Sequence, residues 1–401
     1  MPEAKSLEEL REEEYRLRLE VNDLRRAEAA SSGAESAQLL DDLETAEKAL
    51  LAVEAARAAA EAESGLGGLV VDTGLPKSGQ LGSQTTGLDA RVRLRLEHVP
   101  TAIYHLFTAE ETPLVSCRVK NTSDKIRRLR VSSFMERYSA RAVDTVELDA
   151  DDVHEFNQLP ALFPDRVKEL TEVTRAALNI LVEDLDGAVE LHKTVPIWLL
   201  ARTTAPLRAR DPATGQWKSM YRYFGAFVTP NQPALMSFLR TAAERHPDKA
   251  FVGYQGNPTK VEPQVRALFE ALKQDANIIY VNSILDMHPS QTASAQRVRL
   301  PRESLADRQA NCIDGTVLFA SLLEGVSLSP ALVIIPGHAF VAWETWKSSG
   351  QWKYLETTRI GTHSFEEACA RGEYHAQQHA PDKTLLPVRQ LRSRSGLMPM
   401  E

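Results

Sequence analysis

Three residues in the C-terminal half of the chain could together carry out thiol chemistry. Cys312 stands just before an apolar run, His338 opens a strand-like stretch, and Glu356 ends another. A thiol nucleophile needs a base to take its proton, and the base needs an orienting partner. The three residue types in this order therefore predict a nucleophile, a general base and an orienting acid.

The residues around Cys312 predict that it lies in the first turn of a helix. Asn311 is a favourable N-cap, Asp314 stands where a capping-box acid belongs, and Gly325 suits the far end. At that position the unsatisfied N–H groups and the helix dipole favour a thiolate. The backbone N–H of Cys312 would also point at a developing oxyanion.

His338 and Glu356 are predicted to lie on neighbouring strands. Residues 331–335 form a buried apolar stretch, Pro336-Gly337 forms a turn, and residues 352–356 form a third strand. In an antiparallel sheet Glu356 could accept a hydrogen bond from one ring nitrogen of His338. The other nitrogen would then act on Cys312.

The stretch 309–358 resembles the core of the transglutaminase-like cysteine hydrolases, a branch of the papain-like superfamily, and 230–375 does so more weakly. In that family a cysteine opens a helix, a histidine opens a strand, and an acid lies in a Trp-x-x-Leu-Asp-Pro-Thr-like strand. The last element reads here as Trp-Lys-Tyr-Leu-Glu-Thr-Thr over 352–358. The resemblance implies that Cys312 is the nucleophile, His338 the base and Glu356 the orienter. Two departures are the longer Glu356 in place of Asp, and Thr357 in place of Pro.

The resemblance also implies a second oxyanion donor upstream of the cysteine. Gln309 is the nearest side-chain amide, and Gln291 and Gln296 are further candidates. Cys117 and Cys369 lack any comparable context, so we expect them to be packing residues.

A metal site is the competing interpretation of one further segment. His375 and His379 are four residues apart and could share a helix face, with Cys369 or Glu373 nearby. Such pairs are also common on solvated helices. We therefore expect no metal site and no cofactor.

The rest of the chain predicts an α+β protein of several parts. Residues 1–63 carry leucines at heptad spacing, such as Leu10, Leu17 and Leu24, which predicts a helical hairpin or short coiled coil. Residues 64–88 read as a flexible linker, 89–210 as a β-sandwich, 211–385 as the transglutaminase-like catalytic domain and 386–401 as a C-terminal tail. The sandwich includes Asn-Thr-Ser at 121–123, a glycosylation pattern that we interpret as a turn.

Composition narrows the classes of function. The 401 residues have a net charge of −8, which gives no general attraction to nucleic acid or anionic membrane. No apolar stretch is long enough for a membrane span, the start lacks a secretory signal, and only three cysteines are present. We therefore expect a cytoplasmic protein with reduced thiols.

These features favour a cysteine-dependent amide hydrolase, a protease or isopeptidase, that acts on a protein or peptide through a thioester. Acyl transfer to an amine, which crosslinks proteins, uses the same residues and remains an alternative. The other alternative is a catalytically inactive transglutaminase-like scaffold. In each case the N-terminal helices could bind a second copy or another protein.

Overall fold

The computed structural model describes residues 87–96, 98–185, 189–210, 217–281 and 293–400, together with scattered positions between 9 and 56. The chain divides into two compact units. Unit 1 comprises Met1–Gly65, Met220–Leu285 and Arg297–Glu401, and unit 2 comprises Leu66–Ser219 and Asp286–Gln296. Separate helices and sheets confirm the α+β class. Of the predicted linker, residues 64–86 lie outside the described part of the chain.

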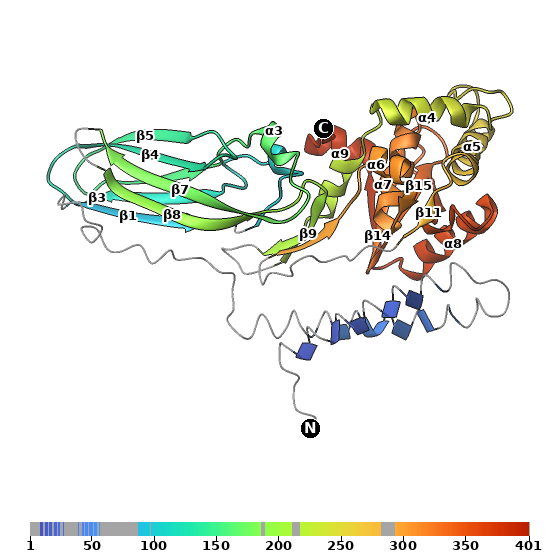
Figure 1. The fold of residues 1–401 in the computed structure, drawn as a ribbon, viewed down its shortest axis with the longest axis horizontal. Coiled ribbons are helices and arrows are strands. Elements are labelled where there is room, and N and C mark those ends of the chain that lie inside the picture. The colour runs from blue at the N-terminus through green and yellow to red at the C-terminus, as the bar shows by residue number, and fades with distance from the viewer. Residues whose placement is uncertain are drawn as a thin grey trace. The chain divides into compact units, whose positions relative to one another are not determined.

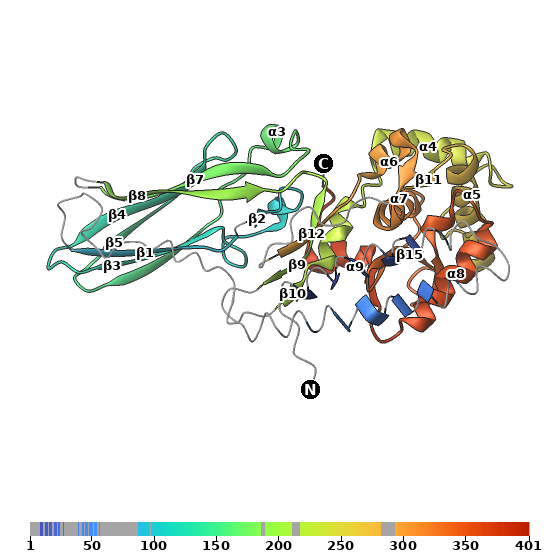
Figure 2. The same ribbon diagram turned by 60° about the horizontal axis from the view of Figure 1, so that its bottom comes forward.

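Two sheets face each other in the described part of unit 2 (Figures 1 and 2). One has the order β1-β3-β6, formed by Leu88–Leu94, Val115–Asn121 and Val153–Gln158. The other has the order β2-β8-β7-β4-β5, formed by His98–Val99, Val189–Leu199, Thr174–Asp184, Arg127–Met135 and Ala142–Leu148. Apolar side chains at alternate positions, such as Val119, Val131 and Ile180, are fully buried. The apolar residues that recur at every second position of these strands therefore form the core of this unit.

β6 presents mostly exposed side chains at a sheet edge, so its apolar alternation is weak. β7 follows the short helix α3, Pro164–Val167. A smaller sheet with the order β10-β9-β12 is formed by Trp217–Ser219, Thr204–Arg210 and Ala293–Arg297.

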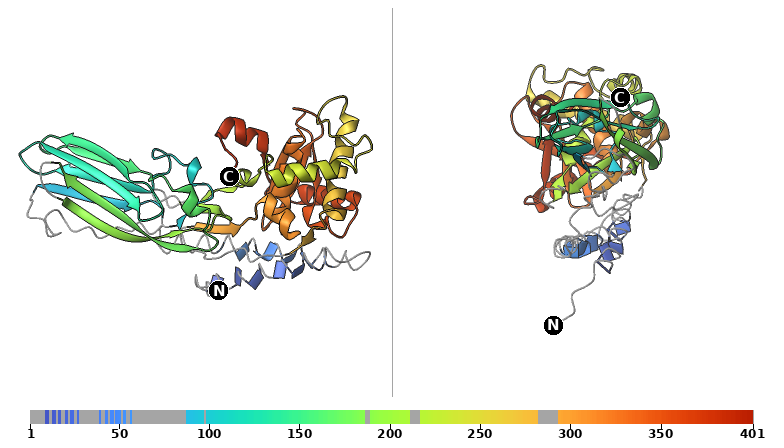
Figure 3. Two further views of the ribbon diagram at one scale, coloured as in Figure 1. Left: turned by 45° about the horizontal axis from the view of Figure 1, so that its top comes forward. Right: turned by 90° about the vertical axis from the view of Figure 1, so that its left-hand side faces the viewer.

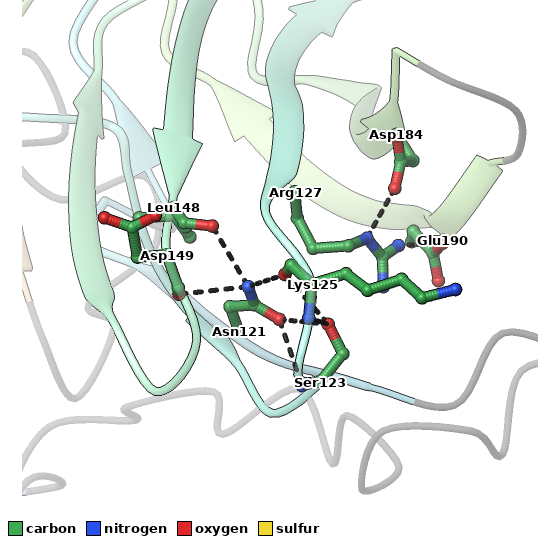
Figure 4. Close-up of polar contacts among 8 residues, drawn as sticks. All are labelled: Asn121, Ser123, Lys125, Arg127, Leu148, Asp149, Asp184 and Glu190. Carbon is green, nitrogen blue, oxygen red and sulfur yellow. Dashed lines mark hydrogen bonds and ion pairs between the residues drawn. The ribbon is translucent and has the colours of Figure 1, made fainter.

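The turn predicted at residues 121–123 is confirmed (Figure 4). The Asn121 side chain is fully buried, and its Nδ2 donates to the carbonyls of Lys125, Leu148 and Asp149 at 2.7, 3.0 and 3.0 Å. Its Oδ1 accepts from the backbone and hydroxyl of Ser123. Every polar group of this amide is therefore engaged in holding the turn. Close by, Arg127 of β4 pairs with Asp184 of β7 and Glu190 of β8.

Unit 1 is built on an antiparallel sheet with the order β16-β15-β14-β17 (Figures 1 and 3). These strands are Trp352–Leu355, His338–Glu344, Pro330–Ile335 and Thr384–Pro387. Helix α7, Cys312–Gly325, packs on β14 and β15, and helix α8, Phe365–Gln378, packs on β16. The side chains of α7 from Cys312 to Leu323 are buried, because this helix is apolar nearly all round.

Two further helices of unit 1 are α4, Pro233–Ala243, and α5, Val261–Gln274. Unit 1 also contains the helices α6, Pro301–Asp307, and α9, Val388–Ser395. Short 3₁₀ turns occur at Tyr104–Leu106, Tyr221–Phe227, Pro258–Lys260 and Thr357–Arg359.

The segment 386–401, which the sequence marks as a tail, begins inside β17 and continues into α9. Leu386 pairs with Leu332 of β14, and Val388 is fully buried. Arg392 donates to the Val228 carbonyl at 2.7 Å and pairs with Glu324 at 3.0 Å. The end of the chain thus completes the edge of the sheet.

The described positions between 9 and 56 are helical. One buried cluster joins two parts of this segment. It contains Leu17 and Val21 together with Leu43, Ala46 and Leu50. Among the described residues, no helix is both long enough and apolar enough to cross a membrane.

Candidate active site

Cys312 is the first residue of helix α7, as the sequence predicts. Asn311 Oδ1 accepts from the Asp314 N–H at 2.8 Å, and Asp314 Oδ2 accepts from the Asn311 N–H at 3.2 Å. Arg299 adds a backbone hydrogen bond and an ion pair to the same carboxylate, at 2.7 and 3.1 Å. This reciprocal cap determines where the helix starts and so places the cysteine in its first turn.

His338 and Glu356 lie side by side, which confirms the predicted neighbourhood of the two side chains. The turn before β15 contains Gly337 at a φ of 66°, a left-handed conformation that glycine adopts without strain. His338 Nε2 and Glu356 Oε2 are 2.7 Å apart, and both side chains are buried. The other carboxylate oxygen accepts from the Thr358 N–H at 3.0 Å and from its hydroxyl at 2.8 Å. The carboxylate is therefore held from both ends.

A second imidazole, which the sequence interpretation did not connect with this site, lies against the same carboxylate oxygen. His375 Nε2 is 3.7 Å from Glu356 Oε2, and its ring centroid is 5.3 Å from that of His338. Burial by itself would raise the pKa of Glu356, but His338 and His375 outweigh it and hold this pKa well below its usual range. The carboxylate accordingly stays ionised.

His375, which the sequence offered as a competing metal ligand together with His379, instead lies beside Glu356. The rings of His375 and His379 are 6.2 Å apart, and His379 is the residue that caps the C-terminus of α8. Among the described residues, the group of potential metal ligands that lie together is His338, Glu356 and His375. The i, i+4 spacing of His375 and His379 does not predict this group, because the partners of His375 come from two other segments of the chain.

A close approach of α8 to β16 brings His375 to Glu356. A Cβ on Gly372 would lie 2.7 Å from the backbone nitrogen of Leu355 and 2.8 Å from the carbonyl carbon of Tyr354. The Glu356 N–H also donates to the Ala368 carbonyl of α8 at 3.0 Å. The absence of a side chain at Gly372 thus lets the helix backbone rest directly on the strand.

Helix α7 also packs against the segment that carries Glu356, through Thr357. A Cβ on Gly315 would stand 3.0 Å from Thr357 Oγ1. That hydroxyl donates to the Cys312 carbonyl at 3.4 Å. Thr357, which follows Glu356 directly, therefore connects this segment to the first turn of α7.

The cysteine and the histidine are both buried, with 7% and 6% of their surface exposed. Within the described part of the chain, no hydrogen bond joins the Cys312 thiol to the His338 ring. The structure thus brings His338 and Glu356 into direct contact and joins Cys312 to them through Thr357.

One pocket opens onto this cluster. His338, Glu356 and His375 line it, and so do Tyr280 of β11, Ile279–Tyr280, and Arg371 of α8. The sequence interpretation singled out neither Tyr280 nor Arg371. For Arg371 a signal was present, since it lies one helical turn before His375.

The candidates for a second oxyanion donor are separated by the fold. Gln309 lies half-buried on β13, Gln309–Ala310, in parallel register with Ile279 of β11. Gln296 lies on β12 in unit 2, and Gln291 lies outside the described residues. The role of Gln309 stays a prediction.

The other two thiols lie in environments that disfavour the thiolate. Burial, with Glu155 nearby, raises the pKa of Cys117 to about 12. Burial, with Glu262 nearby, raises the pKa of Cys369 to about 12. Both stay protonated at neutral pH.

Comparison with known proteins adds little to this description. No protein-family model and no curated protein matches the chain. A solved structure, that of a FixG-related protein from Vibrio parahaemolyticus, is similar over 29% of this chain and 99% of its own, at 13% identity and a TM-score of 0.19.

Proposed function

We propose that this protein is a cysteine-dependent amide hydrolase, a protease or isopeptidase, with the catalytic set Cys312, His338 and Glu356. The observation that carries the proposal is the buried contact of 2.7 Å between His338 Nε2 and Glu356 Oε2, tied through Thr357 to the helix that begins at Cys312. A carboxylate on Nε2 selects Nδ1 as the ring nitrogen that exchanges a proton with the nucleophile. The resemblance of residues 309–358 to transglutaminase-like hydrolases agrees with these roles.

The proposed reaction has two halves. The Cys312 sulfur attacks the amide carbon, and its proton passes to His338. The tetrahedral oxyanion then collapses, the carbon–nitrogen bond breaks, and His338 protonates the leaving amine to give a thioester. Water, deprotonated by His338, attacks the thioester and releases the acid and the thiol. Glu356 stabilises the imidazolium in both halves.

Reactive geometry requires the thiol and the imidazole to meet. In free enzymes this contact is often looser than in the substrate complex. We therefore expect substrate to close the remaining gap between Cys312 and His338. The proposed substrate is a protein or peptide in the cytoplasm, and the N-terminal helices are proposed to mediate self-association.

An activity-based acyl probe with an electrophilic carbon tests the proposal. Intact-mass and peptide mass spectrometry should find the adduct on Cys312, and the Cys312→Ser and His338→Asn variants should form none. Release of the acyl group by water supports hydrolysis, whereas its recovery on an added primary amine indicates acyl transfer. An unreactive Cys312 in a folded wild-type protein would support an inactive scaffold.

A further inference from the structure

Three potential ligands for a metal ion meet in the lining of the pocket. One ligand atom from each of His338, Glu356 and His375 lies within 4.8 Å of the other two, and the three side chains are nearly inaccessible. They come from β15, from the residue that follows β16 and from α8, so the fold assembles the group from positions 18 and 19 residues apart along the chain (338 to 356, 356 to 375).

The spacing is close to that of a zinc site. With bonds of about 2.0–2.1 Å and tetrahedral angles, neighbouring ligands of Zn²⁺ lie about 3.3 Å apart. The distances from Glu356 Oε2 to His338 and to His375, 2.7 and 3.7 Å, lie on either side of this value. Small side-chain rotations would place all three atoms on one ion, with water as a further ligand.

The carboxylate is also oriented as a ligand requires. Thr358 holds Glu356 Oε1 with two hydrogen bonds, so Oε2 faces the two imidazoles. The Ala368 carbonyl holds the Glu356 backbone against the helix that carries His375. Such supporting hydrogen bonds orient the ligands of metal sites.

The donor set selects the kind of ion. Two imidazoles and one carboxylate suit Zn²⁺, whereas Mg²⁺ and Ca²⁺ prefer sites made of oxygen atoms. Arg371 lines the same pocket, and its positive charge repels all divalent cations alike, so the imidazole nitrogens decide between them. An ion that bonds strongly to imidazole nitrogen is therefore the best match.

We propose that His338, Glu356 and His375 bind one Zn²⁺ ion and that this binding switches the thiol chemistry off. A metal ion on Nε2 leaves the proton of a neutral imidazole on Nδ1. His338 can then no longer take the proton of Cys312, and Glu356 no longer stabilises an imidazolium. The binding stands on the geometry of the three side chains, and only its inhibitory effect rests on the function proposed above.

Zinc binding is measured directly on the full chain without a histidine tag, by competition with a chromophoric zinc indicator. We expect one ion per wild-type chain and at least tenfold weaker binding by His375→Asn. His379→Asn is the matched control, because it changes a histidine four residues further along, at the C-terminal cap of the same helix. It should bind as wild type does, and so should Cys312→Ser.

A second measurement needs no variant. Co²⁺ added to the wild-type protein should give visible d–d bands without the intense near-ultraviolet absorption of thiolate ligation. Equal zinc affinity of wild type and a folded His375→Asn would overturn the proposal. A thiolate band, with loss of binding in Cys312→Ser, would overturn it as well.

The effect on reactivity is read from alkylation of Cys312 by iodoacetamide. Zinc should slow this labelling in wild type, a chelator should restore it, and His375→Asn should need at least tenfold more zinc for the same effect. Zinc that binds through His375 without slowing a reactive Cys312 would overturn the switch. If Cys312 is unreactive even without zinc while the ion still binds, the proposed hydrolase fails and the metal site stands.

Discussion

Gly315 and Thr357 lie so close that a Cβ on the glycine would be 3.0 Å from the threonine hydroxyl oxygen and 3.1 Å from its Cβ. Gly372 stands in the same relation to the backbone of Leu355, at 2.7 Å. The two glycines belong to the helices that carry Cys312 and His375. The two helices therefore pack closely against the segment that carries Glu356. This packing places His375 and the first turn of α7 beside Glu356.

Gly372→Ala should therefore destabilise the protein. The new methyl group meets backbone atoms, and overpacking of this kind costs about 1–3 kcal/mol, against a gain of about 1 kcal/mol in helix propensity. We expect a net loss of about 1 kcal/mol or more in the free energy of unfolding, measured by urea denaturation.

Gly325→Ala, on helix α7, is the control for this substitution. Its nearest neighbour is Leu239 Cδ1 at 2.9 Å, the end of a flexible side chain that can move aside. Its effect should be within about 0.5 kcal/mol of zero. If both variants are equally stable, the close approach at Gly372 is not a constraint on the fold.

Gly315→Ala should affect the site more than stability. The added methyl group pushes on Thr357, which can shift by a few tenths of an ångström, but Thr357 adjoins Glu356 and bonds to the Cys312 carbonyl. We expect slower acylation of Cys312 by an active-site probe with an unfolding free energy near that of wild type. Acylation at the wild-type rate would show that the contact does not transmit position to the site.

The three thiols should label in a fixed order. At pH 7, iodoacetamide should modify Cys312 first, because the pKa values of Cys117 and Cys369 are raised to about 12. Thiolate content rises tenfold per pH unit below the pKa, so labelling of the half-buried Cys369 should grow steadily from pH 7 to pH 10. Peptide mass spectrometry gives the site, and Cys312→Ser should abolish the early phase. Equal, slow labelling of all three thiols would contradict a reactive Cys312.

Glu356→Gln should keep the side-chain shape and remove its charge. Without the carboxylate the imidazolium of His338 loses its stabilising partner, and we expect acyl-enzyme formation to slow by about a hundredfold or more. Glu356→Asp should be intermediate, because the shorter side chain retracts from His338 and from Thr358. Rates for both variants close to that of wild type would remove Glu356 from the proposed catalytic set.

Removal of residues 1–64 should reduce the size of any oligomer. Leucines at heptad spacing in this segment are typical of helices that pack against a second helix. Leu17 and Leu50 of this segment lie in one buried cluster. Light scattering on the full and shortened chains measures the change. Urea denaturation of the shortened chain serves as the control that the rest of unit 1 stays folded, because residues 1–64 belong to unit 1 and Leu43 lines the pocket beside His338. An unchanged oligomer mass would contradict the role in self-association.

Local patterns in the sequence determined much of this protein. Asn311 and Asp314 flank the start of an apolar helix, and these caps depend on residues only three apart, so Cys312 could be placed before any coordinates. The buried apolar runs of β14 and β15 and the turn between them similarly depend on neighbours along the chain. The meeting of His338 and Glu356 followed from the register of adjacent strands.

Tertiary structure alone decided the rest. His375 reached Glu356 because Gly372 let α8 rest on β16, and no local signal tells which distant backbone a glycine will contact. The pairing of Leu386 with Leu332 likewise turned an apparent tail into a strand. Such contacts join segments far apart in the sequence, and their free energy comes from packing that exists only once the whole sheet and its helices have assembled.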